Sequence, residues 1–224
     1  MTVGRGEKWP DWRRDVFGDP YLVWHDGPDF ARLLSVARDE PEVVARMLGA
    51  GMAARDPLAA ESIAALAGDG LAPSGAEGLL RAALPAASGT FQVRLAQALQ
   101  VLTGDEAWAE PVASVLAAGA HWGDRIDAAI ALAGFAPTPR LVEALARAVR
   151  DRYYLVRYHA ANTLLRYAGR RRDVSDHPAL FALISSGDDD TKPDAEVTAQ
   201  RAEAARRLSA AVALSRQSVD LGDS

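Results

Sequence analysis

The sequence predicts an all-α protein, a right-handed α-solenoid of about five helix hairpins. Strand signals are nearly absent, because no sustained apolar and polar alternation of β-branched residues is bounded by Asn-Gly or Asp-Gly turns. Segments rich in Ala, Leu, Arg and Glu instead carry apolar residues at helical spacing and are broken by Gly, Pro and Asp. One such segment recurs along the chain, which indicates a repeat architecture.

The recurring segment aligns on an arginine. The stretches RLAQALQV, RIDAAIAL, RYHAANTL and RAEAARRL fall into register when one column holds Arg94, Arg125, Arg157 and Arg201. An alanine follows each arginine by four positions, and a valine or leucine follows it by seven. A small residue lets a neighbouring helix approach closely, and a large aliphatic residue fills the seam between stacked units. The pattern therefore predicts stacked hairpins, with an insert at 187–196 before the last one.

The expected elements follow in chain order. Residues 1–27 hold Trp9, Trp12 and Trp24 without clean periodicity, and we interpret them as an N-terminal cap over the first repeat. Residues 28–215 form the solenoid, and 216–224 form a flexible tail. Besides the first three arginine segments, the expected helices are 28–38, 41–54, 57–67, 75–84, 106–118, 138–150, 177–186 and a final helix at 194–215.

The best-formed unit carries a family resemblance. DRYYLVRYHAANTLLRYAG (151–169), with its Asp, Val-Arg, Ala-Ala and closing Gly, resembles the second-helix consensus of HEAT and HEAT-like repeats of the phycobilisome-lyase type. WGDRIDAAIALAG (122–134) and FQVRLAQALQVLTG (91–104) are similar to it, with Asp124 replacing the usual Val and Gln97 replacing an Ala. The resemblance implies that the arginine pairs with acidic groups or carbonyls of neighbouring repeats, which is a structural role.

Composition excludes several function classes. The chain has no cysteine, which excludes disulfides, thiolate zinc sites and a cysteine nucleophile. Its four histidines lack the HxxxH and HExxH spacings, and no GxGxxG, Walker or GxSxG motif is present, so we expect no metal and no cofactor. No apolar run approaches the roughly 20 residues of a membrane span, and the N-terminus lacks the apolar region of a secretory signal. We therefore expect a cytoplasmic protein without membrane contact.

The surface expected to function is the concave face, which the second helices of the hairpins line. The predicted partner-binding residues on it are Asp127, Tyr158, His159, Asn162, Glu203 and Arg206. We predict a non-catalytic interaction module that presents this preformed surface to a protein or peptide partner. No catalytic residue is assigned, and the sequence leaves the partner and the oligomeric state open.

Two other function classes stay open. Arginines gather between residues 140 and 172, and a candidate anion or nucleic-acid patch there comprises Arg166, Arg170, Arg171 and Arg172. HEAT-like folds include the alkylpurine DNA glycosylases, and a relative of these would use Asp124 or Asp127 with Trp122. The net charge of −5 favours internal pairing or an acidic protein partner over nucleic acid. The third class is a small-molecule enzyme or lyase-like protein that uses Asp127, Tyr158 and His159.

Overall fold

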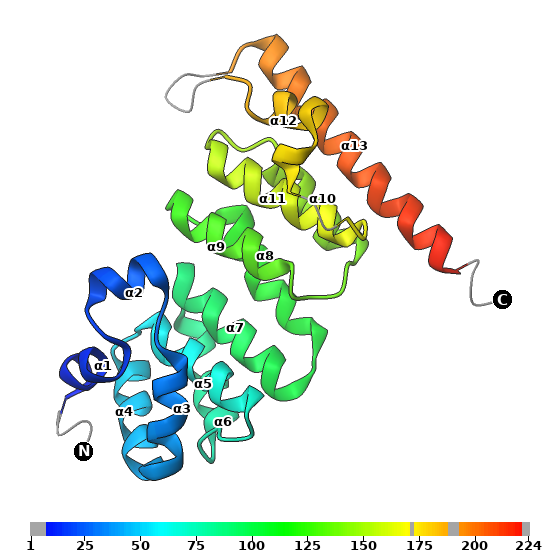
Figure 1. The fold of residues 1–224 in the computed structure, drawn as a ribbon. Helices are drawn as coiled ribbons and strands as arrows, with labels where there is room; N and C mark the ends of the chain where they lie inside the picture. Colours follow the sequence, from blue (N-terminus) through cyan, green and yellow to red (C-terminus); the bar gives the residue numbers. More distant parts are fainter. Residues whose placement is uncertain (1–7, 171–172, 188–192, 221–224) are drawn as a thin grey trace. The chain divides into compact units, whose positions relative to one another are not determined.

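The computed structural model describes residues 8–170, 173–187 and 193–220 (Figure 1). Within these ranges the chain is helical and contains no strand, which confirms the all-α prediction. The chain divides into two compact units, Met1–Trp108 and Ala109–Ser224, so the division falls inside the range 28–215 that we expected to be one solenoid. The division follows Gly104, which ends a helix with a left-handed φ of 68°. None of the described helices combines the length and apolarity that a membrane span requires.

Unit 1 begins with a helix that belongs to its core. The elements of the unit are α1 (Trp9–Phe17), α2 (Pro20–Asp26), α3 (Phe30–Asp39), α4 (Pro41–Ala53), α5 (Pro57–Gly68), α6 (Ala76–Ala83), η1 (Leu84–Ala86), α7 (Gly89–Thr103) and η2 (Glu106–Trp108). α1 packs against α3 and α4, and its Trp9 and Trp12 are buried. Two of the three tryptophans expected in the cap therefore lie in the hydrophobic core, while the side chain of Trp24 lies outside the described part.

A glycine permits the close packing at this end of unit 1. Gly51 lies on α4, and a Cβ at that position would come within 2.7 Å of the Trp9 ring and 2.8 Å of the Ala59 Cβ. The indole Nε1 of Trp9 donates a hydrogen bond of 2.9 Å to Asp56, which also begins α5 by accepting from the Leu58 amide. One carboxylate thus joins α1 to the start of α5.

Unit 2 contains three successive helix pairs. Its elements are α8 (Ala109–Ala118), α9 (Trp122–Leu132), α10 (Pro139–Ala148), α11 (Tyr154–Tyr167), η3 (Val174–Asp176), α12 (Pro178–Ile184) and α13 (Ala195–Asp220). α8 packs on α9, α10 on α11 and α12 on α13 (Figure 1). The arginine-bearing helices also contact one another in sequence order, α9 with α11 and α11 with α13. α13 continues to Asp220, past the start of the expected tail at 216, because no Gly or Pro interrupts it before Gly222.

The helices of unit 2 bury the residues that the repeat pattern predicts. The alanines four positions after the arginines, Ala129, Ala161 and Ala205, are buried where these helices meet their neighbours. The leucines seven positions after them, Leu132, Leu164 and Leu208, are buried as well. Two hydrogen bonds join α11 to α9: the Thr163 hydroxyl donates to the Ala129 carbonyl at 2.7 Å, and the Tyr167 hydroxyl donates to the Leu132 carbonyl at 2.7 Å.

The register fails in part on α7 of unit 1. Ala96 and Leu99, which the register places on the open face, are buried, and Leu99 belongs to the core of this unit. Val101, which should fill a seam, is 48% exposed. α7 packs against α5 and α6, and the residues that it buries differ from those of its counterparts in unit 2. The expectation of one continuous open face along all arginine segments is therefore wrong for α7.

Candidate functional site

The aligned arginines hold the backbone of unit 2. Arg157 is buried and donates to three carbonyl oxygens: Ile184 at 2.6 Å, Asp151 at 2.9 Å and Arg152 at 2.6 Å. Arg125 repeats the pattern, because it donates to the Gly119 carbonyl at 2.7 Å and forms an ion pair with Asp151 at 3.0 Å. Both arginines bond a carbonyl six residues earlier, in the turn that precedes their own helix. Their hydrogen bonds are structural and reach the next helix pair, as the family resemblance implied.

Two of the predicted partner-binding residues, Tyr158 and Asn162, hold a turn. The Tyr158 hydroxyl donates to Asp173 at 2.8 Å, and the Asn162 amide donates to the same carboxylate at 2.7 Å. The Asn162 oxygen in turn accepts from the Val174 amide at 2.8 Å. These bonds fasten the η3 turn against α11, so both side chains have a structural task.

Asp173 is the acceptor at the centre of this cluster. Partial burial opposes its ionisation, but hydrogen bonds from Ser175, Tyr158 and Asn162 outweigh burial and lower the pKa of Asp173 to about 2. The same bond from the phenol to the carboxylate, with burial, raises the pKa of Tyr158. Asp173 was not among the residues predicted from the sequence. A signal was present in Asp173-Val174-Ser175, because an aspartate that accepts from the amide two residues on is typical of a turn or helix start.

His159 lies within the electrostatic influence of two carboxylates, those of Asp173 and Asp127. Burial of the imidazole lowers the pKa of His159, while the carboxylates of Asp173 and Asp127 oppose this effect. The imidazole is therefore mainly neutral at pH 7. A neutral imidazole near a carboxylate can act as a general base, so His159 with Asp127 is where an enzymatic function would be sought.

Glu203 and Arg206 lie on α13 and bind each other. The Glu203 carboxylate accepts from Arg206 Nε at 2.9 Å and from Arg207 Nε at 2.7 Å. These bonds, those of Arg206 first, lower the pKa of Glu203. Both arginines are exposed, so the group is a solvated network on one helix. Its contribution to stability is small.

The candidate nucleic-acid patch is placed only in part. Arg166, in the last turn of α11, and Arg170 are exposed. Arg171 and Arg172 lie outside the described residues. Two other arginines of the basic stretch pair with carboxylates, Arg140 with Glu110 at 2.8 Å and Arg147 with Glu143 at 2.6 Å.

Large apolar side chains are exposed on the helices that carry Asp127 and His159. Ile130 of α9 is 47% exposed and Leu155 of α11 is 41% exposed. Asp127 and Ile130 share one face of α9 because they are three residues apart, and the spacing of Leu155, His159 and Asn162 places these three on one face of α11. We call this surface the α9/α11 face; it comprises Asp127, Ile130, Leu155, His159 and Asn162.

A row of stacked rings lies at the start of the same two helices. The Trp122 ring stacks on Tyr153 with centroids 6.1 Å apart, and His121 tilts against Trp122 at 5.5 Å. The Arg152 guanidinium lies 4.8 Å from the centre of the Tyr153 ring. The partly exposed Trp122 ring therefore has an aromatic neighbour on each of two sides, His121 and Tyr153. Trp122, which a relative of the glycosylases would use, thus takes part in packing between α9 and the start of α11.

Comparisons with protein families, with curated proteins and with solved structures give no match for this chain. In the part of the chain that the structure describes, no three His, Asp or Glu side chains gather as metal ligands do.

Proposed function

We propose that the protein is a non-catalytic, cytoplasmic interaction module of the HEAT-like α-solenoid type. Its α9/α11 face binds a protein segment that offers apolar side chains. One observation carries the proposal: Ile130 and Leu155 are large aliphatic residues that lie exposed on the face predicted to bind a partner. A surface that exposes more than one large aliphatic side chain is a candidate for a partner to cover.

Hydrogen bonds of α9 and α11 support the proposal. Tyr158 and Asn162 hold the η3 turn through Asp173, and Arg125 and Arg157 bind backbone carbonyls. Side chains fixed in this way keep the surface rigid, and a rigid surface loses little conformational entropy when a partner binds.

The test is affinity capture from a lysate of the source organism, after nuclease treatment. The tagged wild type is compared with the double variant Ile130→Ser/Leu155→Ser. The control is Leu214→Ser, which changes an aliphatic residue of α13 that is 65% exposed and lies outside the α9/α11 face. All three changes are at exposed positions, so thermal unfolding of the variants should match the wild type closely.

The expected result is a protein that the wild type and Leu214→Ser retain and the double variant loses. The identified partner should then bind the purified wild type at least about tenfold more tightly than the double variant, since hot-spot truncations exceed about 1.4 kcal/mol. Capture that is equal for all three proteins would refute this face as the binding surface. Recovery of nuclease-sensitive nucleic acid alone would favour the arginine patch instead.

A further inference from the structure

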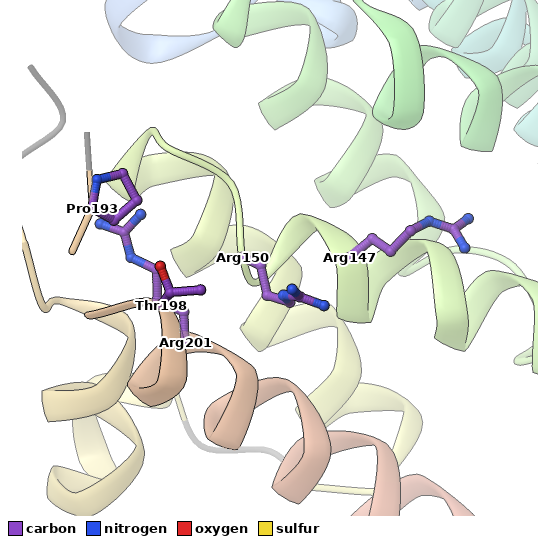
Figure 2. A pocket seen from close by; sticks show the side chains of 5 residues that line it. All are labelled: Arg147, Arg150, Pro193, Thr198 and Arg201. Carbon is purple, nitrogen blue, oxygen red and sulfur yellow. The ribbon is translucent and has the colours of Figure 1, made fainter. Parts of the chain in front are cut away.

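A cavity of about 350 Å³ lies in unit 2 between the end of α10 and the start of α13 (Figure 2). The described residues that line it are Arg147, Arg150, Pro193, Thr198 and Arg201. Arg147 lies in the last turn of α10 and Arg150 in the turn after it, whereas Thr198 and Arg201 lie on α13. α10 packs against α13, which brings together arginines that are about fifty residues apart in sequence. The cavity volume is in the range of small-ligand sites, roughly 300–1,000 Å³.

Arg201 is the one arginine of the described lining whose guanidinium is held by backbone carbonyls. It is only 2% exposed, and its guanidinium donates to the carbonyl oxygens of Ser186 at 2.8 Å and Asp151 at 3.3 Å. A cation held in the partly dehydrated interior acts on a neighbouring anion more strongly than a surface cation does. Its position is set by the fold, so a ligand would not have to order it.

The other two arginines can adjust to a ligand. Arg150 is exposed, and Figure 2 shows its side chain and that of Arg147 both extending away from Arg201, so neither is fixed against that buried guanidinium. Arg147 pairs with Glu143 on its own helix, but this pair is exposed and therefore weak. The Thr198 hydroxyl already donates to the Asp194 carbonyl at 2.8 Å, so the arginines are the donors of this site.

We propose that this cavity binds a small phosphate-bearing anion of the diphosphate class. The described lining contains three arginines and no carboxylate, and guanidinium groups match phosphate oxygens with paired hydrogen bonds. The lining brings three positive charges to one cavity, and two linked phosphate groups, which carry more negative charge than one, match three cations better than a single phosphate does. This site is separate from the α9/α11 face, so it can exist whether or not that face binds a protein.

The test is isothermal titration of the full chain with inorganic pyrophosphate, at constant ionic strength, with sulfate as the control anion. The variant is Arg150→Gln, which removes an exposed cation from the lining. The matched variant is Arg140→Gln, on the same α10 helix, where the arginine is exposed and pairs with Glu110 outside the cavity. Arg201 is left unchanged because it holds backbone carbonyls.

The expected result is saturable binding of pyrophosphate that is at least about tenfold weaker in Arg150→Gln and unchanged in Arg140→Gln, because one charge-assisted hydrogen bond is worth about 1.5 kcal/mol or more. Absence of saturable binding in the wild type would overturn the proposal. Equal weakening by both variants, or equal affinity for sulfate, would indicate general screening of a basic surface and would overturn it too.

A second variant addresses competition from the chain itself. Asp188, Asp189 and Asp190 precede Pro193 in the sequence and lie outside the described residues. Three fewer negative charges make the chain as a whole less repulsive to an anion, so changing all three to asparagine should leave pyrophosphate affinity unchanged or raise it. A fall in affinity would contradict a site for anions.

Discussion

Asp173→Asn tests whether one carboxylate fastens the η3 turn to α11. In the wild type the carboxylate accepts four hydrogen bonds, from Tyr158, Asn162, the Ser175 amide and the Ser175 hydroxyl. Asparagine replaces one acceptor oxygen with an NH₂ group, which is a donor. If that group faces the Asn162 amide, two donors meet; if it faces Tyr158 and Ser175, the Ser175 amide loses its acceptor and the two hydroxyls can no longer donate there. The substitution therefore breaks the cluster in either orientation.

The lowered pKa of Asp173 gives the size of the expected loss of stability. A pKa of about 2 in the folded protein, against 3.8 in the unfolded chain, corresponds to about 2 kcal/mol of stability at neutral pH. The turn lies at the surface, so solvent screening reduces this contribution to about 1–2 kcal/mol. For a chain of this length such a loss lowers the melting temperature by about 2–8 °C.

The pH dependence has a definite sign. Because folding lowers the pKa, the stabilisation is complete well above pH 3.8 and is lost as the pH falls through about 2. About half of it remains at pH 3. The difference in stability between wild type and Asp173→Asn should therefore shrink by about half between pH 7 and pH 3.

The assay is urea and thermal unfolding followed by circular dichroism at both pH values. Asp176→Asn is the control, because Asp176 is an exposed carboxylate in the same turn. It should change the free energy of unfolding by less than about 0.5 kcal/mol. Two results would refute the reasoning: equal destabilisation by the two substitutions, or a wild-type advantage over Asp173→Asn that is the same at pH 3 as at pH 7.

Three further outcomes are expected. Burial lowers the pKa of His159, so protonation favours the unfolded chain, and the wild type should lose stability relative to His159→Gln as the pH falls through 6.5 in unfolding titrations. Arg157→Met should cost about 3 kcal/mol or more in urea unfolding, because three carbonyls lose their donor, whereas the exposed Arg152→Met should cost far less. Gly51→Ala should lower the melting temperature, because overpacking against Trp9 costs about 1–3 kcal/mol of unfolding free energy. Gly49→Ala, where a Cβ meets nothing within 4 Å, should be neutral or stabilising.

From residue 28 onward the sequence by itself determined the helical elements and their order, whereas α1 and α2 lie in the N-terminal stretch where no helix was predicted. Asp56-Pro57 and Thr138-Pro139 begin helices where the pattern indicated, and Gly104 ends one. These signals are local, because caps, stops and apolar spacing act within one or two turns of the chain. The alanines and leucines in register with the arginines were readable for the same reason, and in unit 2 they are buried as predicted.

The sequence could indicate only part of the candidate site. It identified the faces of α9 and α11, and it placed Asp127 near His159 because equivalent positions in adjacent repeats lie close together. It did not show that Tyr158 and Asn162 are engaged by Asp173, since no repeat position corresponds to that aspartate. The path of the connection between α11 and α12 decides this contact.

Tertiary structure alone decided where distant segments meet. It divided the chain after Trp108, buried Leu99 in unit 1 where the register expected an open face, and brought Arg150 and Arg201 to one cavity. Each of these outcomes depends on how helices rotate and cross as they pack, which is set by many side chains at once. Helical periodicity fixes which residues share a face of one helix, but the packing of neighbouring helices determines which face is covered.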